Sequence, residues 1–262
     1  MTLADRLRAH VETLARSERS QDLETPARYI EEVLAETSSH YFRSGGRDVR
    51  NLETGSGDIV VGAHYDTVPG SLGADDNASG VAVLIELSKM LSGIRFVAFA
   101  NEEAPYFLGP EMGSFVYARD RAQGVRAMFS LEMLGYYRDE PGSQRYPAPL
   151  GLFYPDRGNF IAFVADLGSF SLVRKSSRLF RQNSDFPSEW LAAPSIVPGL
   201  SWSDHWSFRQ HGYPAVMVTD TAFYRYPHYH LPSDTPEKLD YERMARVTMG
   251  LAAMLKDLNE AR

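Results

Sequence analysis

The sequence predicts an α/β fold: a single-domain, three-layer α/β/α arrangement around a mostly parallel, mixed central sheet. Short apolar runs alternate with amphipathic helical patterns, which is typical of parallel sheets. The chain has 262 residues, enough to bury a sizeable core in one domain. No repeat, low-complexity tract or linker divides it. We therefore expect one domain over residues 1–262, with N-terminal helices within residues 1–37 packed on the α/β core.

The N-terminal part predicts two helices followed by two strands. Apolar residues recur at three- and four-residue spacing over residues 2–17, which predicts an amphipathic helix; they are Leu3, Leu7, Val11 and Leu14. A second helix is expected over residues 26–35, because Thr25-Pro26 combines a capping residue with a first-turn proline. Short strands are expected near residues 38–43 and 47–53.

The middle of the chain carries the clearest strand signals. Continuous apolar runs are typical of strands buried on both faces, and they predict strands over residues 58–64, 94–100 and 126–132. Helical spacing predicts helices between them, over residues 77–91 and 113–121. Together these segments form the predicted parallel core.

The C-terminal part is less regular. It predicts helices over residues 158–167, 170–181 and 237–259 and a strand over residues 215–219. The intervening segments are rich in proline and aromatic residues, so we expect them to be irregular: 138–157, 184–203 and 221–235.

Composition excludes several classes of function. The formal net charge is −7, which argues against a nucleic-acid partner. The chain has no cysteine, which excludes disulfides, thiolate metal sites and a cysteine nucleophile. Its N-terminus is charged throughout, and no apolar run approaches the ~18 residues that span a bilayer. We expect a cytoplasmic protein without a membrane partner; the oligomeric state is not indicated.

Ionisable residues lie where the predicted central strands end. Because the carboxyl ends of parallel strands meet at one edge of a sheet, we expect these residues to converge there. They are His64 and Asp66, Glu102 and Glu103, and Glu132, with Asp75 and Asp76 in the loop before the first central helix.

A cluster of carboxylates and histidine requires compensating cations. Like charges at short range repel strongly, and bound metal ions remove that repulsion. Nitrogen and oxygen ligands without thiolate suit zinc, manganese or cobalt. The number of ligands exceeds what one tetrahedral ion needs, so the sequence predicts two ions, about 3.5–4 Å apart.

Five motifs, in this order, resemble those of the co-catalytic zinc aminopeptidase family (the twenty-eighth metallopeptidase family), which is related to the glutaminyl cyclases. The resemblance spans roughly residues 58–245. The motifs are His64-Tyr-Asp66-Thr, Gly73-Ala-Asp-Asp76-Asn-Ala-Ser-Gly80, Asn101-Glu102-Glu103, Glu132-Met-Leu-Gly135 and His230-x-x-x-Asp234-Thr.

The resemblance implies a zinc-aminopeptidase (phosphorylase/hydrolase-like) fold and a site for two Zn²⁺ ions, with Co²⁺ or Mn²⁺ as alternatives. Asp76 would bridge the two ions. His64 and Glu132 would complete one site, and Glu103 and His230 the other. Many members of the family have aspartate where this chain has Glu132, and glutamate is one methylene longer.

The resemblance also assigns roles around the metals. Glu102 matches the general base, which takes a proton from water and passes it to the leaving amine. Asp66 would hydrogen-bond the far nitrogen of a ligand histidine and fix its tautomer. Tyr229 matches a position that stabilises the oxyanion in some members.

Three further features have alternative interpretations. Asp204 and His205 are either part of a substrate-pocket wall or ordinary polar residues at a helix start. His228 is an alternative to His230 as the last ligand, although His230 fits the motif spacing. Residues 104–112 are expected to form a loop over the site that restricts the substrate.

The leading functional hypothesis is hydrolysis of the N-terminal residue from a peptide or aminoacyl substrate. The alternative is a glutaminyl-peptide cyclase, which uses a single zinc ion; that relative typically has tryptophan at the position of Tyr229. A catalytically inactive binding homologue is a third hypothesis, weakened because all five candidate ligands are present. Metal stoichiometry distinguishes the first two.

Overall fold

The computed structural model describes residues 1–261 and confirms the α/β class with a mixed central sheet. The sheet has eight strands in the order β1-β2-β4-β3-β5-β8-β6-β7. In chain order they are β1 (Ser38–Ser44), β2 (Arg47–Gly55), β3 (Ile59–His64), β4 (Arg95–Phe99), β5 (Ala127–Glu132), β6 (Ile161–Asp166), β7 (Ser188–Ala193) and β8 (Ala215–Thr219). The central strands β4, β3, β5 and β8 are parallel. Their carboxyl ends therefore share one edge.

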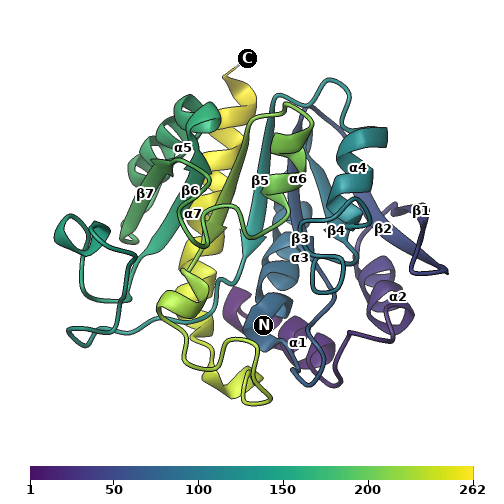
Figure 1. Cartoon of the computed structure of the whole chain (residues 1–262), viewed down its shortest axis with the longest axis horizontal. Helices are drawn as coiled ribbons and strands as arrows, with labels where there is room; N and C mark the ends of the chain where they lie inside the picture. The colour runs from purple at the N-terminus through teal and green to yellow at the C-terminus, as the bar shows by residue number, and fades with distance from the viewer. Residues whose placement is uncertain (262) are drawn as a thin grey trace.

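Helices cover both faces of the sheet (Figure 1). One face packs against α1 (Leu3–Leu14), α2 (Glu24–Val33), α3 (Gly80–Met90), α5 (Phe170–Asn183) and α7 (Tyr241–Glu260). The other face packs against α4 (Gly113–Arg121) and α6 (His205–Gln210). Within this layer, helix α1 packs mainly against α7, α3 and residues 74–79. Among residues 1–261, no helix combines the length and the apolar character needed to cross a bilayer.

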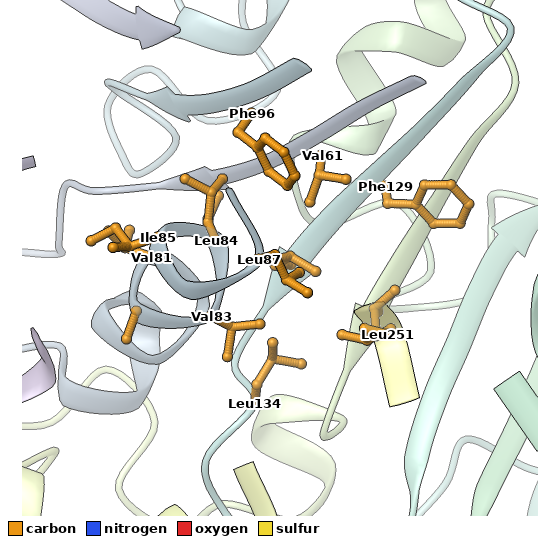
Figure 2. Packing of buried hydrophobic residues seen from close by; sticks show 14 of the residues in the cluster. Val61, Val81, Val83, Leu84, Ile85, Leu87, Phe96, Phe129, Leu134 and Leu251 are labelled. Atoms are coloured by element: carbon orange, nitrogen blue, oxygen red, sulfur yellow. The ribbon is translucent and has the colours of Figure 1, made fainter. Parts of the chain in front are cut away.

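The core alternates along each central strand. In β3, Val61 and Ala63 face the α3 side, whereas Val60 packs with the α4 side. Figure 2 shows Val61, Phe96 and Phe129 from three strands gathered with Leu84 and Leu87 of α3. Every residue of β3, β5 and β8 is buried, which explains why these strands appear in the sequence as continuous apolar runs.

Two C-terminal expectations were wrong. Residues 158–167, predicted to be helical, contain strand β6, and residues 184–203, predicted to be irregular, contain strand β7. A short apolar run such as Ile161–Ala165 fits a buried strand as well as a helix, so spacing alone does not distinguish them. β6 runs antiparallel to β8 and parallel to β7.

The helix predicted over residues 77–91 begins later than expected. Residues 74–79 form a wide π-type turn in which Asp76 and Asn77 depart from helical dihedral angles, and α3 starts at Gly80. Such turns occur frequently at functional sites. Here the turn brings Asp76 to the carboxyl edge of the sheet before the regular helix starts.

Candidate metal centre

The five predicted ligands lie together at the carboxyl edge of the central strands. His64 ends β3, Glu132 ends β5, and Glu103 follows β4, directly after the predicted base Glu102. The remaining two, Asp76 and His230, come from loops. Their nitrogen and oxygen atoms form two groups with ligand spacing, His64–Asp76–Glu132 and Asp76–Glu103–His230.

Asp76 belongs to both groups and uses a different oxygen in each. Its Oδ1 lies 3.3 Å from Nε2 of His64, and its Oδ2 lies 3.0 Å from Nε2 of His230. Glu132 Oε1 is 3.5 Å from the same His64 nitrogen, and Glu103 Oε1 is 3.3 Å from that of His230. A carboxylate shared in this way has the arrangement of a bridging ligand.

The chemistry of these donors fits metal ions. His64 is buried, and neither of its ring nitrogens has a hydrogen-bond partner among the described residues. A buried polar group without a partner is costly, and a cation would supply the partner for Nε2. A third, overlapping group joins His64 to Glu102 and Glu103. Glu102 Oε2 is 4.0 Å from Nε2 of His64, so the predicted base lies beside the ligands.

The pKa shifts describe a site with excess negative charge. Burial raises the pKa of Glu103 to about 7, with the Asp76 carboxylate adding to the effect. Burial also raises the pKa of Glu102, despite the opposing effect of His64. Burial alone would lower the pKa of His230, but hydrogen bonding to Asp76 and Glu103 raises it to about 10. Without metal, protons would take over part of the charge balance that cations provide.

Backbone geometry at the site is unusual. Asn101, which precedes Glu102, has a φ of 57°, and Met133, which follows Glu132, has a φ of 52°. His230 itself has a φ of 58°. Residues other than glycine rarely adopt this left-handed region, and such conformations cluster at functional sites. In each case the bend lies at or next to a residue of the cluster.

Asp66 mainly binds backbone rather than histidine. Its Oδ1 lies 3.4 Å from Nδ1 of His64, a distance too long for a good hydrogen bond. Its two oxygens instead accept the backbone N–H groups of Glu102 and Glu103, each at 3.0 Å. Asp66 therefore orients the turn that carries the predicted base and one ligand.

Asp234 performs the same task for the other loop and was not predicted as a site residue. Its carboxylate accepts the backbone N–H groups of Asp75 and Asp76 at 2.9 and 3.2 Å and the Tyr226 hydroxyl at 2.8 Å. Ser203 is also new: its hydroxyl donates to Oε2 of Glu132 at 2.7 Å. Asp234 already lay within the motif that contains His230, whereas Ser203 had no sequence signal.

Asp204 and His205 have different surroundings in the structure. Asp204 is fully buried, and its pKa is raised to about 7 by burial, with His64 opposing the shift and Glu132 adding to it. His205 donates through Nε2 to the Leu200 carbonyl oxygen at 2.8 Å, and its Nδ1 has no hydrogen-bond partner among residues 1–261. Burial lowers the pKa of His205 to about 4. Its ring is therefore neutral, and its hydrogen bond to Leu200 fixes the loop that precedes α6.

The aromatic residue before the last ligand packs on it. The Tyr229 ring stacks on His230 with centroids 3.8 Å apart. His228, the alternative ligand, belongs to neither ligand group; its Nδ1 lies 2.9 Å from the Ser233 hydroxyl. Residues 104–112 form successive turns, and Phe107 there contacts Trp202 edge-on.

An open cavity adjoins the cluster. Glu132 and Tyr229 contribute to its wall, and most of the remaining lining is apolar or aromatic, including Ala162, Val164, Trp190, Leu191, Met217 and Phe223. The other carboxylate in the lining, Glu189, is paired with Arg181 at 3.3 Å. The cavity thus opens beside the cluster of candidate ligands, but its lining is mostly apolar where theirs is charged.

Solved structures share this architecture. The Legionella pneumophila LapA aminopeptidase is 21% identical with a TM-score of 0.75, covering 98% of this chain and 72% of that one. A zinc aminopeptidase from Bacillus subtilis is 25% identical with a TM-score of 0.61, covering 82% and 51%. The Porphyromonas gingivalis glutaminyl cyclase is 18% identical with a TM-score of 0.71, covering 98% and 100%.

Sequence relatives support a family assignment. The uncharacterized protein YfbL of Escherichia coli K12 is 40% identical over 89% of this chain and 80% of its own length. A probable leucine aminopeptidase of Arthroderma benhamiae is 26% identical over 75% of this chain, which spans about half (53%) of that relative. The model of peptidase family M28 matches residues 49–255. This chain therefore belongs to peptidase family M28.

Proposed function

We propose that this protein is a di-zinc aminopeptidase that removes N-terminal residues from peptides. The observation that supports this most is the sharing of Asp76 between two histidine–carboxylate groups, with Glu102 adjacent to both. Two ions held side by side suit hydrolysis, because they can orient both the attacking water and the carbonyl.

Each side chain would have a separate role. His64 and Glu132 would hold one ion, Glu103 and His230 the other, and Asp76 both. Zinc, when bound, polarises a carbonyl and makes water more acidic. The Glu102 carboxylate would take the proton of the attacking water and deliver it to the leaving amine, as a general base and then a general acid.

Tyr229 would assist at the substrate carbonyl. It stacks on His230 and forms part of the cavity wall, so it lies between the proposed metal site and the proposed substrate pocket. A phenolic hydroxyl at such a position can donate a hydrogen bond to the oxygen that gains negative charge.

The adjoining cavity suggests the class of N-terminal side chain. Its lining is mostly apolar, and the Glu189 carboxylate already has Arg181 as a partner. A charged side chain would lose its hydration there without gaining a free partner, whereas an apolar side chain gains about 25 cal/mol per Å² buried. We therefore propose a preference for large apolar residues such as leucine or phenylalanine.

Metal analysis combined with a panel of aminoacyl arylamides tests this function. About two zinc ions per chain and turnover of the leucine and phenylalanine substrates are expected. One ion per chain, with cyclisation of N-terminal glutamine and no arylamide turnover, would instead favour a glutaminyl cyclase. Zinc uptake without either activity would indicate a binding homologue.

A further inference from the structure

A buried arginine from outside the family match contacts the loop that joins the candidate ligands His64 and Asp76. Arg19 follows α1 in the N-terminal segment, which precedes the matched residues 49–255. Only 1% of its surface is exposed. Arginine is rarely buried to this extent without partners, so its contacts indicate what it does.

The guanidinium group of Arg19 donates to four backbone carbonyls. Its Nε binds Tyr65 at 2.8 Å, and its terminal nitrogens bind Leu14 at 2.9 Å, Leu72 at 2.7 Å and Gly73 at 2.9 Å. Its own backbone N–H donates to the Thr67 hydroxyl at 2.8 Å. A planar group with five fixed donors is well suited to bridge several carbonyls at once.

Apart from Leu14, which ends α1, these partners lie in the one loop, residues 65–73, that joins His64 to the turn carrying Asp76. Tyr65 lies between His64 and Asp66, and Gly73 begins the turn that leads to Asp76. Gly73 has a φ of 58°, and a Cβ atom there would collide with the Asp76 carbonyl oxygen and the Thr67 side chain and would lie 2.8 Å from Nη2 of Arg19. The turn and the side chains packed on it therefore leave no room for any other residue at position 73.

Arg19 also balances two buried carboxylates that are not ligands. Burial lowers its pKa to about 10, with the carboxylates of Asp234 and Asp66 opposing the shift most strongly, so it remains protonated at neutral pH. Asp66 accepts the backbone N–H groups of Glu102 and Glu103, and Asp234 those of the Asp75-Asp76 turn. The cation thus lies near both of the carboxylates that orient ligand-bearing backbone.

We propose that Arg19 is a positioning residue of the metal centre, which holds together the two ends of the loop between His64 and Asp76 and balances the charge of Asp66 and Asp234. This inference rests on the proposed metal site. It gives the N-terminal segment a part in building a site whose ligands all lie within the family match. Residues that orient metal ligands typically change metal affinity by about 10- to 100-fold when they are lost.

Zinc affinity, measured by competition with a chelator, tests the proposal without using activity. We expect Arg19→Met to weaken zinc binding about 10- to 100-fold. Arg19→Lys keeps the charge but has only three donors, so it should fall between that variant and the wild type. The matched control is Arg50→Met: Arg50 is 6% exposed and donates to Glu24, Glu31 and Ser39, none of them in the site.

The outcomes are distinct. If folded Arg19→Met, or Arg19→Lys where the methionine variant does not fold, binds zinc as tightly as the wild type, the inference is overturned. It is also overturned if Arg50→Met weakens zinc binding equally, because loss of any buried arginine would then suffice. A wild-type protein that binds no zinc would overturn the proposed function itself, and this inference with it.

Discussion

The two halves of the sheet's carboxyl edge have opposite chemistry. At the ends of β3, β4 and β5, buried ionisable side chains lie within 3.0–3.5 Å of one another in the two ligand groups. Beyond β5, strands β6 and β8 contribute to a cavity lined mainly by apolar groups. The first half has the donor groups of a metal site, and the second has none among the described residues. Reaction and selection are therefore expected to depend on different residues.

Removal of metal should have the largest effect, and it should affect only the first half. A chelator is expected to abolish peptidase activity, because the carbonyl loses its polarising ions. Zinc or cobalt should restore it. Tryptophan emission from Trp190 and Trp202, which line the cavity, should show that the second half stays folded. Full turnover by metal-free protein would contradict the proposed mechanism.

Replacement of the proposed general base should have the second-largest effect. Glu102→Gln should lower kcat by about 10²- to 10⁴-fold, since glutamine cannot accept the proton. Its zinc content, measured by elemental analysis, should match the wild type because Glu102 is not one of the proposed ligands. Glu111→Gln is a suitable control: Glu111 is an exposed residue of the following loop whose carboxylate accepts from Ser44 and Gly45. An unchanged kcat in the Glu102→Gln variant would contradict the assignment of Glu102 as the general base.

Filling the cavity should change selectivity and leave the metal half intact. Ala162→Phe occupies space on the β6 wall, so kcat/KM for a leucine or phenylalanine substrate should fall about 10- to 200-fold relative to an alanine substrate. Ala192→Phe is the matched control, because Ala192 packs toward the helices on the opposite face of β7. An equal loss for every substrate in the Ala162 variant would indicate that the cavity does not receive the side chain.

The smallest effect concerns stability rather than activity. His205 has a pKa lowered by burial to about 4, below the ordinary value of about 6.5. The unfolded chain therefore binds the proton first as the pH falls. The neutral ring contributes about 3 kcal/mol to the free energy of unfolding. This contribution is complete above pH 6.5 and is lost as the pH falls toward 4.

Urea unfolding of His205→Gln at several pH values measures this contribution. The difference in unfolding free energy between wild type and variant should change with pH between 6.5 and 4 and stay constant above that window. Zinc affinity should be unchanged, because Nε2 of His205 contacts the Leu200 carbonyl rather than a ligand. Weaker zinc binding in this variant would place His205 in the metal half after all.

Predictability from sequence also differs between the two halves. The strands ending in His64 and Glu132 were expected within a residue or so of their observed ends, because doubly buried strands leave continuous apolar runs. The candidate ligands His64 and Glu132 could be identified from the sequence because they are the last residues of these strands. In the cavity half, β8 was predicted over its observed residues, but β6 and β7 were missed. Ile161–Ala165 is too short for its period to be resolved, and β7 is only partly buried.

The sequence by itself determined the α/β class, the parallel core and the residue types at its carboxyl edge, because these depend on local apolar patterns and on the residues that come directly after each strand. Only the tertiary structure decided which oxygen of Asp76 approaches which histidine, that Asp66 and Asp234 bind backbone, and that Arg19 binds both ends of the loop between His64 and Asp76. Arg19 and Gly73 are 54 residues apart in the chain. No local pattern records a contact at that separation, because it depends on packing between elements.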